Sequence, residues 1–247
     1  MATFRHAGDL GDIIYSLPVV KHFGGGDFLI EPAPYTRVFL TRDKWCGIDL
    51  LLAQQSYING VRAFRIGEYA TFNLNDFRSA MNEMMRQKRF MDKSLCDWML
   101  ETHKVPLSAR DVPWLKVDPN QVAKVVINRS GAGRPHNSCY HNWKFPWHRV
   151  WSKYVGQAVF IGTKAEHEAF CDTCGDIAYH PTANLLEAAQ VIAGSELFIG
   201  NQSVCHAIAE GLKKRIILEV WPQGPNCLFF RDNVTHFWEG KLNLPDL

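Results

Sequence analysis

Short apolar runs alternate with helical patterns along the second half of the chain. The runs "KVVINRS" (124–130) and "QAVFIGT" (157–163) are apolar throughout their centres and end in polar residues. This pattern is typical of parallel strands that are buried on both faces of a sheet. Two more strands are expected at 196–202 and 215–222, and two helices at 184–195 and 203–214. Because strands and helices alternate, the sequence predicts a doubly wound parallel sheet.

The first half shows the same alternation with weaker signals. Strands are expected within "TFRHA" (3–7), "GGGDFLIEP" (24–32) and "VRAFRIG" (61–67), with a helix over 12–23. In the amphipathic stretch 77–100, Met and aromatic residues recur at spacings of three and four. Such spacing is typical of a helical surface that packs against other elements.

A boundary between two domains is expected near the middle of the chain. The segment 109–124 contains two prolines and mixed polarity, which is typical of a linker. We therefore expect one α/β domain over 1–115 and a second over 116–247, the latter with a C-terminal tail. The predicted fold class is α/β, with two Rossmann-like domains that face a cleft.

The overall composition is that of an ordinary folded protein. Of the 247 residues, 47% are hydrophobic and 21% are charged, and 27 Lys plus Arg nearly balance 25 Asp plus Glu. This balance gives no indication of a nucleic-acid partner, although a local basic patch is compatible with it. No apolar run approaches the roughly 20 residues that span a bilayer, so no transmembrane segment is expected.

Seven cysteines are scattered through the chain, and we find no export signal. These two features favour reduced thiols in a cytoplasm, which for a viral protein is that of the host. His167, Cys171, Cys174 and His180 have a spacing that superficially resembles a zinc site. A single C-x-x-C without a second ligand pair is a weak signal, so we expect buried thiols there and no metal.

Glycines and carboxylates alternate in "GDLGD" (8–12), at the entrance of the first predicted helix. Helix N-termini attract anions, and Gly8 and Gly11 let the backbone approach a ligand. The run differs from the dinucleotide fingerprint G-x-G-x-x-G, and two carboxylates repel a pyrophosphate, which disfavours a nicotinamide enzyme. We expect Asp9 to cap the helix and Asp12 to accept a proton from a substrate hydroxyl.

A loop with several cations follows the strand predicted at 124–130. Cations gathered in this way suit a diphosphate by charge and by the bidentate geometry of guanidinium groups. A solvated basic loop beside a tryptophan-rich helix is an equally weighted interpretation. The residues concerned are Arg129, Arg134, His136, His141 and Lys144.

The next strand end carries "GTKAEHE" (162–168), which introduces a helix. Gly162 and Thr163 lie at the strand end, and Thr163 with Glu166 has the T-x-x-E spacing of a capping box. We expect His167 to be exposed rather than catalytic.

A further strand end carries Asn201, Gln202 and Ser203, with His206 in the first turn of the helix that follows. The amides and hydroxyls of such a helix start favour an anion. Glu219 ends the next strand, and its carboxylate suits the two hydroxyls of a ribose.

Together these segments resemble the heptosyltransferase-like glycosyltransferases of family nine. The run at 8–25 resembles their opening pattern G-D-x-G-D followed by L-P, and 199–214 resembles their nucleotide-sugar motif D-S-G-x-x-H-x-A-A-A-L-G. Asn201 and Ser203 replace the Asp and Gly of that motif. The resemblance covers the opening run and most of 123–226, as in a short divergent member of the phage type.

The resemblance implies a GT-B fold, with an acceptor-side domain over 1–115 and a nucleotide-sugar-binding domain over 116–247. It implies inverting transfer of a sugar from a nucleotide-diphosphate co-substrate to an acceptor hydroxyl, without an obligatory cofactor or metal. By motif position Asp12 is the general base, and Gly8, Asp9 and Gly11 form the acceptor loop. The expected donor-binding residues are Arg129, Lys144, Gly162, Thr163, Asn201, Gln202, Ser203, His206 and Glu219.

Several alternatives remain open at this point. The sugar is a hexose, heptose or pentose, and the acceptor is a carbohydrate or modified DNA. The Arg- and Lys-bearing segment "FRSAMNEMMRQKR" (77–89) is compatible with a phage-type DNA glycosyltransferase that acts on a hydroxymethylated base. The departures from the donor motif are instead compatible with a non-catalytic nucleotide-sugar-binding protein.

Overall fold

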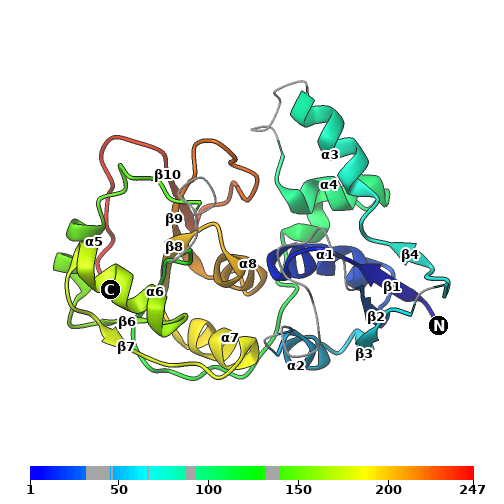
Figure 1. Ribbon diagram of the computed structural model, residues 1–247, viewed down its shortest axis with the longest axis horizontal. Helices are drawn as coiled ribbons and strands as arrows, with labels where there is room; N and C mark the ends of the chain where they lie inside the picture. Colours follow the sequence, from blue (N-terminus) through cyan, green and yellow to red (C-terminus); the bar gives the residue numbers. More distant parts are fainter. Residues whose placement is uncertain (32–44, 46, 66, 87–92, 132–139) are drawn as a thin grey trace. The chain divides into compact units, whose positions relative to one another are not determined.

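The chain divides into two compact units, each with its own parallel sheet (Figure 1). The N-terminal unit comprises Met1–Val117 with Asn184–Leu186, and the C-terminal unit comprises Asp118–Ala183 with Glu187–Leu247. The computed structural model describes residues 1–31, 45, 47–65, 67–86, 93–131 and 140–247. Two parallel α/β sheets are therefore present, as the hydrophobic pattern predicts.

The sheet of the N-terminal unit has the strand order β3-β2-β1-β4, and all its pairs are parallel. Strand β1 thus lies inside the sheet, between β2 and β4. The elements of this unit are β1 (Thr3–His6), α1 (Leu10–His22), β2 (Gly26–Ile30), α2 (Ile48–Ala53), β3 (Ile58–Ala63), β4 (Phe72–Asn73), α3 (Phe77–Arg86), α4 (Leu95–Thr102) and the 3₁₀ helix η2 (Leu107–Arg110).

Helix α1 of the N-terminal unit is buried along most of its length. Its residues from Ile13 to Val20 are all buried, and the helix packs against α4. The turn that follows requires glycine at Gly25, which has a positive φ of 85°. A Cβ atom there would lie 1.9 Å from the carbonyl oxygen of Tyr57. Glycine is therefore required in the turn by which the chain passes from α1 to β2.

The amphipathic stretch 77–100 contains two helices, α3 and α4; residues 87–92 lie outside the described part. Helix α4 begins at a capping box: Ser94 accepts a hydrogen bond from the backbone N–H of Asp97, and Asp97 accepts one from that of Ser94. Arg110 forms an ion pair with Asp97. Met99 and Leu100 are buried, so the expected packing role is confirmed for α4.

The sheet of the C-terminal unit has the order β10-β9-β8-β5-β6-β7, again with parallel pairs. Strands β5 and β8 are buried along their whole length, as expected for strands covered on both faces. The elements are β5 (Val125–Asn128), α5 (Trp147–Tyr154), β6 (Ala158–Phe160), α6 (Lys164–Cys174), β7 (Ala178–Tyr179), α7 (Leu185–Gly194), β8 (Leu197–Asn201), α8 (Val204–Gly211), β9 (Arg215–Glu219) and β10 (Val234–Phe237). The first two residues of α7 are grouped with the N-terminal unit.

The C-terminal tail packs on the unit that carries it. The hydroxyl of Tyr154 donates to the carbonyl of Pro245 at 2.6 Å, and Lys153 pairs with Asp246 at 2.6 Å. Leu242 is buried in the same core as Phe237. The tail thus extends the core of the C-terminal unit. Within the described part of the chain, no helix has the length and apolarity needed to cross a membrane.

Candidate functional site

The first candidate site lies in the N-terminal unit, at the carboxyl end of β1. The chain leaves β1 at His6 and enters α1 at Leu10, so residues 7–9 form the loop at this strand end. The side-chain oxygen of Asn75 accepts a hydrogen bond from the backbone N–H of Ala7 at 2.9 Å and fixes the loop. Ligand sites of open parallel sheets lie at this end of the strands.

Asp12 projects from the first turn of α1 and forms an ion pair with Arg78, from the first turn of α3. The distance from Arg78 Nη2 to Asp12 Oδ2 is 2.9 Å, and the Asp12 side chain is 18% exposed. Burial raises the pKa of Asp12 to about 6, and the guanidinium of Arg78 opposes that rise. The carboxylate is therefore a base whose pKa lies close to neutral pH.

His6 lies beside Asp12 and is fully buried. Its Nδ1 accepts a hydrogen bond from the backbone N–H of Gly8 at 2.7 Å, which places the proton of the neutral ring on Nε2. Burial, with the nearby charge of Arg78, lowers the pKa of His6 to about 3. The ring is therefore a neutral hydrogen-bond donor at any physiological pH.

Gly8 lies between these two side chains and leaves no room for a larger residue. A Cβ atom on Gly8 would lie 2.3 Å from His6 Cε1 and 2.9 Å from Asp12 Oδ2. The glycine therefore allows the imidazole and the carboxylate to pack closely against the backbone. Gly11, the other glycine of the predicted loop, lies within the first turn of α1.

Asp9 takes the N-cap position of α1, as predicted, but within the described residues its side chain makes no hydrogen bond to the helix. Instead, the Asp12 carboxylate accepts a hydrogen bond from the backbone of Asp9, which is one half of a capping box. The helix start is thus capped by the residue expected to act as a base. Asp12 therefore combines a capping contact with the role of base that the sequence predicts for it.

Three buried polar atoms near Asp12 have no hydrogen-bond partner within the part of the chain that the structure describes. They are His6 Nε2, Asp9 Oδ1 and Arg78 Nε. Two are donors and one is an acceptor, which is the mixture that a hydroxyl group satisfies because it both donates and accepts. The chemistry of this strand end therefore suits a hydroxyl-bearing ligand.

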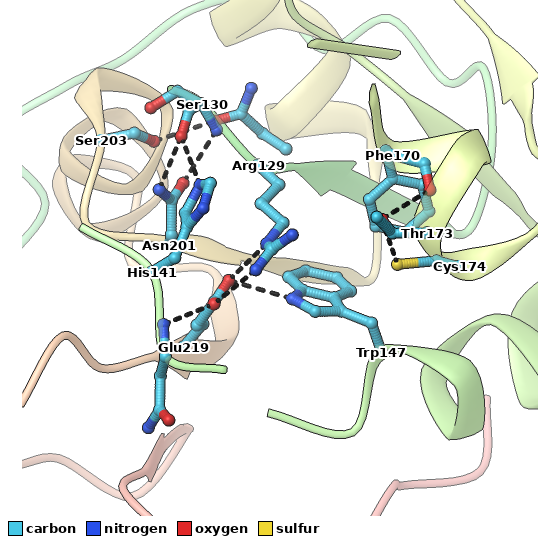
Figure 2. A network of polar contacts seen from close by, with 12 residues as sticks. Arg129, Ser130, His141, Trp147, Phe170, Thr173, Cys174, Asn201, Ser203 and Glu219 are labelled. Carbon is cyan, nitrogen blue, oxygen red and sulfur yellow. Dashed lines mark hydrogen bonds and ion pairs between the residues drawn. The ribbon is translucent and has the colours of Figure 1, made fainter. Parts of the chain in front are cut away.

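The second candidate site lies at the strand ends of the C-terminal unit, where Arg129 follows β5 and Glu219 ends β9 (Figure 2). Arg129 Nε lies 3.0 Å from Glu219 Oε2, and Arg129 Nη2 lies 3.2 Å from Oε1. The Arg129 side chain is 9% exposed and that of Glu219 is fully buried. This is a bidentate ion pair in the interior.

Two more donors reach the Glu219 carboxylate. Trp147 Nε1 donates to Oε2 at 3.0 Å, and the backbone N–H of Asn142 donates to Oε1 at 2.7 Å. Glu219 therefore accepts four hydrogen bonds, and no part of its side chain is exposed. A ribose would have to displace one of these donors, so in this arrangement Glu219 orients Arg129 instead of binding a sugar.

Asn201, at the end of β8, holds the start of the loop that follows β5. Its amide nitrogen donates to the carbonyl of Ser130, and its amide oxygen accepts from the backbone N–H of Ser130, both at 3.0 Å. His141 Nε2 donates to the same carbonyl at 2.8 Å, and burial lowers the pKa of His141. Arg134 and His136, also expected at this site, lie outside the described residues.

Ser203 and Gln202 connect the start of α8 to its neighbours. The Ser203 hydroxyl caps α8 by accepting from the backbone N–H of His206 at 3.4 Å, and it donates to Asn128 Oδ1 at 2.9 Å. The Gln202 amide oxygen accepts from the backbone N–H of Trp221 at 2.7 Å. His206 is buried, and burial lowers its pKa to about 3, so its ring is neutral.

The capping box predicted at the start of α6 is confirmed. Thr163 accepts from the backbone N–H of Glu166 at 3.2 Å, and Glu166 Oε2 accepts from that of Thr163 at 2.9 Å. Glu166 Oε1 also accepts from the backbone N–H of Gly131, so the cap reaches the loop after β5. Gly162 just before it has a φ of 136°, a conformation that favours glycine.

His167 is half-buried, not exposed as the sequence suggested. Its ring stacks on Tyr179 with centroids 4.8 Å apart, and Nε2 lies 2.8 Å from the carbonyl of Ile177. Cys171 lies 3.3 Å from this ring, but Cys171 and Cys174 are only partly buried. Among the residues described, no group of three or more His, Cys, Asp or Glu has a metal-binding arrangement.

Among the described cations of the second site, Lys144 is far more accessible than Arg129. Its Nζ lies 2.8 Å from Glu239 Oε2, and both side chains are 71% exposed. Exposed pairs of this kind contribute little to stability. A phosphate can therefore replace Glu239 as the partner of Lys144 at small cost.

The sequence did not identify Arg78, Asn142 or Trp147 as site residues. Arg78 lies 66 residues from Asp12, and no spacing rule connects the two. An available signal was the position of Arg78 in the first turn of a predicted helix. Trp147 was included only in a tryptophan-rich segment, because the Glu219 carboxylate that its indole contacts lies on a distant strand.

We predict that Glu219→Gln lowers the free energy of unfolding by about 3–5 kcal/mol, because it leaves the buried Arg129 guanidinium without a counter-charge. Urea-induced unfolding measures the change. Glu239→Gln is the matched control, since it breaks an exposed pair in the same unit and is expected to leave stability unchanged. Equal stabilities of the two variants would contradict the structural role of Glu219.

We predict that Arg78→Gln raises the pKa of Asp12 above its value of about 6, because the positive charge that opposes protonation is removed. A carbon-13 NMR titration of the Asp12 carboxyl measures the pKa directly. Arg86→Gln, on the same helix but with a side chain 76% exposed, is expected to leave it unchanged. An unchanged or lower pKa in Arg78→Gln would argue against the ion pair.

No protein-family model and no curated protein sequence matches this chain. Its fold, however, resembles solved structures. E. coli heptosyltransferase WaaC with ADP-2-deoxy-2-fluoro heptose is 11% identical, with a TM-score of 0.61 over 96% of this chain and 92% of that one. The family 9 glycosyl transferase from Veillonella parvula DSM 2008 is 10% identical, with a TM-score of 0.58 over 96% and 85%.

A third similar structure is the dodecameric, iron-containing heptosyltransferase TibC in complex with ADP-D-beta-D-heptose. It is 13% identical, with a TM-score of 0.60 over 97% of this chain and 63% of that one. At identities this low, the likeness establishes the fold. The protein thus has a heptosyltransferase-like fold with two parallel α/β sheets, as its opening and donor motifs predict.

Proposed function

We propose that the protein is a glycosyltransferase that moves a sugar from a nucleotide-diphosphate donor to an acceptor hydroxyl with inversion. The observation that carries this proposal is Asp12, a carboxylate with a pKa of about 6 at the carboxyl end of β1. A general base is most effective when its pKa lies near the working pH. The unpartnered polar atoms around Asp12 supply contacts for the acceptor hydroxyl.

The solved structures of similar fold support a nucleotide-sugar donor. WaaC was solved with an ADP-linked heptose analogue, and TibC with an ADP-linked heptose. For this chain we infer the same class of donor, a nucleoside diphosphate joined to a sugar. Heptose, hexose and pentose are all compatible with the residues described.

In the proposed reaction, the acceptor hydroxyl attacks the anomeric carbon while Asp12 takes its proton. The bond between that carbon and the diphosphate oxygen breaks, and the bonding electrons leave with the diphosphate. Attack opposite the leaving group inverts the anomeric configuration. Arg78 contributes by holding the Asp12 carboxylate ionised at neutral pH. The neutral ring of His6, whose Nε2 has no partner among the described residues, offers a hydrogen bond to the acceptor hydroxyl without competing as a base.

Negative charge develops on the departing diphosphate, and the C-terminal unit offers two features that stabilise it. Lys144 is exposed and carries a positive charge. The start of α8 at Ser203 presents backbone N–H groups and the positive end of the helix dipole. Arg129, which directly follows β5, has its charge balanced by Glu219.

The two arginines described within 77–89, Arg78 and Arg86, do not favour a duplex DNA acceptor over a carbohydrate. Arg78 pairs with Asp12, and Arg86 pairs with Glu83. Arg78 is thus engaged by the expected base, and Arg86 alone of the two is an exposed cation that a phosphate could reach. We therefore place the carbohydrate acceptor first.

We predict that Asp12→Asn lowers the rate of sugar transfer by about 10²–10⁴-fold while donor affinity stays within error, because only the proton acceptor is lost. Product formation from nucleotide sugars with a panel of saccharide acceptors measures the rate, and calorimetry measures donor affinity. Asp49→Asn, which changes a carboxylate at a comparable place in the first turn of α2, is the control and is expected to retain the turnover. Undiminished transfer by Asp12→Asn would refute the assignment of the base.

A further inference from the structure

Trp143 differs from the other tryptophans in its exposure. The chain contains eight tryptophans. Trp143 is 71% exposed, whereas Trp147, Trp114 and Trp45 are buried. Tryptophan is enriched at binding interfaces, because its large ring offers apolar contact area and its N–H a polar contact.

The Trp143 ring has a rigid support. The guanidinium carbon of Arg129 lies 5.5 Å from the ring centroid, and the ring of His141 meets it edge-on at 5.8 Å. Arg129 is itself fixed by its two contacts with Glu219 and lies 5.7 Å from the ring centroid of Trp147. The exposed ring is therefore preorganised, so a ligand that stacks on it loses little entropy in ordering the protein.

The neighbours of Trp143 along the chain place it at the strand ends. Asn142 donates its backbone N–H to Glu219, the last residue of β9. Lys144, which follows Trp143, carries the exposed ammonium group assigned above to the diphosphate. An aromatic surface and a phosphate partner thus come from consecutive residues, as a nucleotide with a flat base and a charged tail requires.

We propose that Trp143 is the stacking platform for the nucleobase of the donor nucleotide. This inference rests on the proposed function, since it assumes a nucleotide donor. Stacking of a base on an aromatic side chain tolerates any base, because every base has a π-face. The platform therefore contributes affinity for nucleoside diphosphates as a class and leaves the choice of base to other contacts.

The test compares nucleotide binding by the full chain and by three variants, with ADP, GDP, UDP and CDP as probes in titration calorimetry. Trp143→Ala is expected to lower the affinity for the tightest-binding nucleotide about 5- to 150-fold. Trp143→Phe retains an aromatic face and is expected to lower the affinity for the same nucleotide by about threefold at most. Phe230→Ala removes a ring of the same unit that is 73% exposed, and it is expected to change nothing.

Pyrophosphate serves as a probe without a base. Its affinity is expected to be the same for the full chain and for Trp143→Ala, because it makes no stacking contact. If Trp143→Ala weakened the binding of pyrophosphate and of the nucleotide equally, the stacking proposal would be overturned. It would also be overturned if Trp143→Ala bound the nucleotide as tightly as the unchanged chain. If the unchanged chain binds none of the four nucleotides, the proposed function fails, and the platform fails with it.

Discussion

The carboxylate of Glu219 is the group around which the strand ends of the C-terminal unit are organised. It is fully buried, and it accepts hydrogen bonds from the Arg129 side chain, the Trp147 indole and the Asn142 backbone. These donors come from the loop after β5 and from the start of α5, so one charge holds together segments that are far apart in sequence. A buried carboxylate is stable only with such a complete set of partners. The direction of Arg129, and with it the support of the Trp143 ring, depends on this set.

Asp12 in the N-terminal unit has a different environment and therefore a different chemistry. It has one guanidinium partner and a backbone contact, and its side chain is partly exposed. Burial raises its pKa towards neutrality while Arg78 keeps it from rising further. Glu219 is saturated and accordingly suits a structural role. Two carboxylates at strand ends thus acquire separate roles from their surroundings, as is common in enzymes that use acid–base chemistry.

The hydrophobic pattern predicted the buried strands well, because β5, β8 and β9 are covered on both faces and read as continuous apolar runs. The pattern was less accurate for the strands at the edges of the sheets. Strand β3 spans Ile58–Ala63 rather than 61–67, since an edge strand with mixed burial has no clear apolar period. Strands β4 and β7 have two residues each and show no period, whereas β10 is an edge strand with only one buried residue.

The sequence predicted several residues of the candidate sites, but it did not predict which side chains they contact. Asp12, Arg129 and Glu219 were each identified at a strand end from local sequence. Their partners were not, because the pairs Asp12–Arg78 and Arg129–Glu219 join positions 66 and 90 residues apart. For the same reason the sequence assigned Glu219 to a ribose, although its oxygens are occupied within the protein. Local spacing identifies a strand end, whereas tertiary packing decides which group remains available to a ligand.

The central claim is that the protein binds a nucleotide-diphosphate sugar, and thermal unfolding in the presence of nucleoside diphosphates and their sugar conjugates tests it most directly. A ligand that binds only the folded state stabilises it by about 2.7 kcal/mol at a hundred times its Kd. For a protein of this size that corresponds to a rise in Tm of about 5–10 °C. The account predicts such a rise with at least one nucleoside diphosphate and its sugar conjugate. A protein that melts cooperatively and shows no rise with any of them would contradict it.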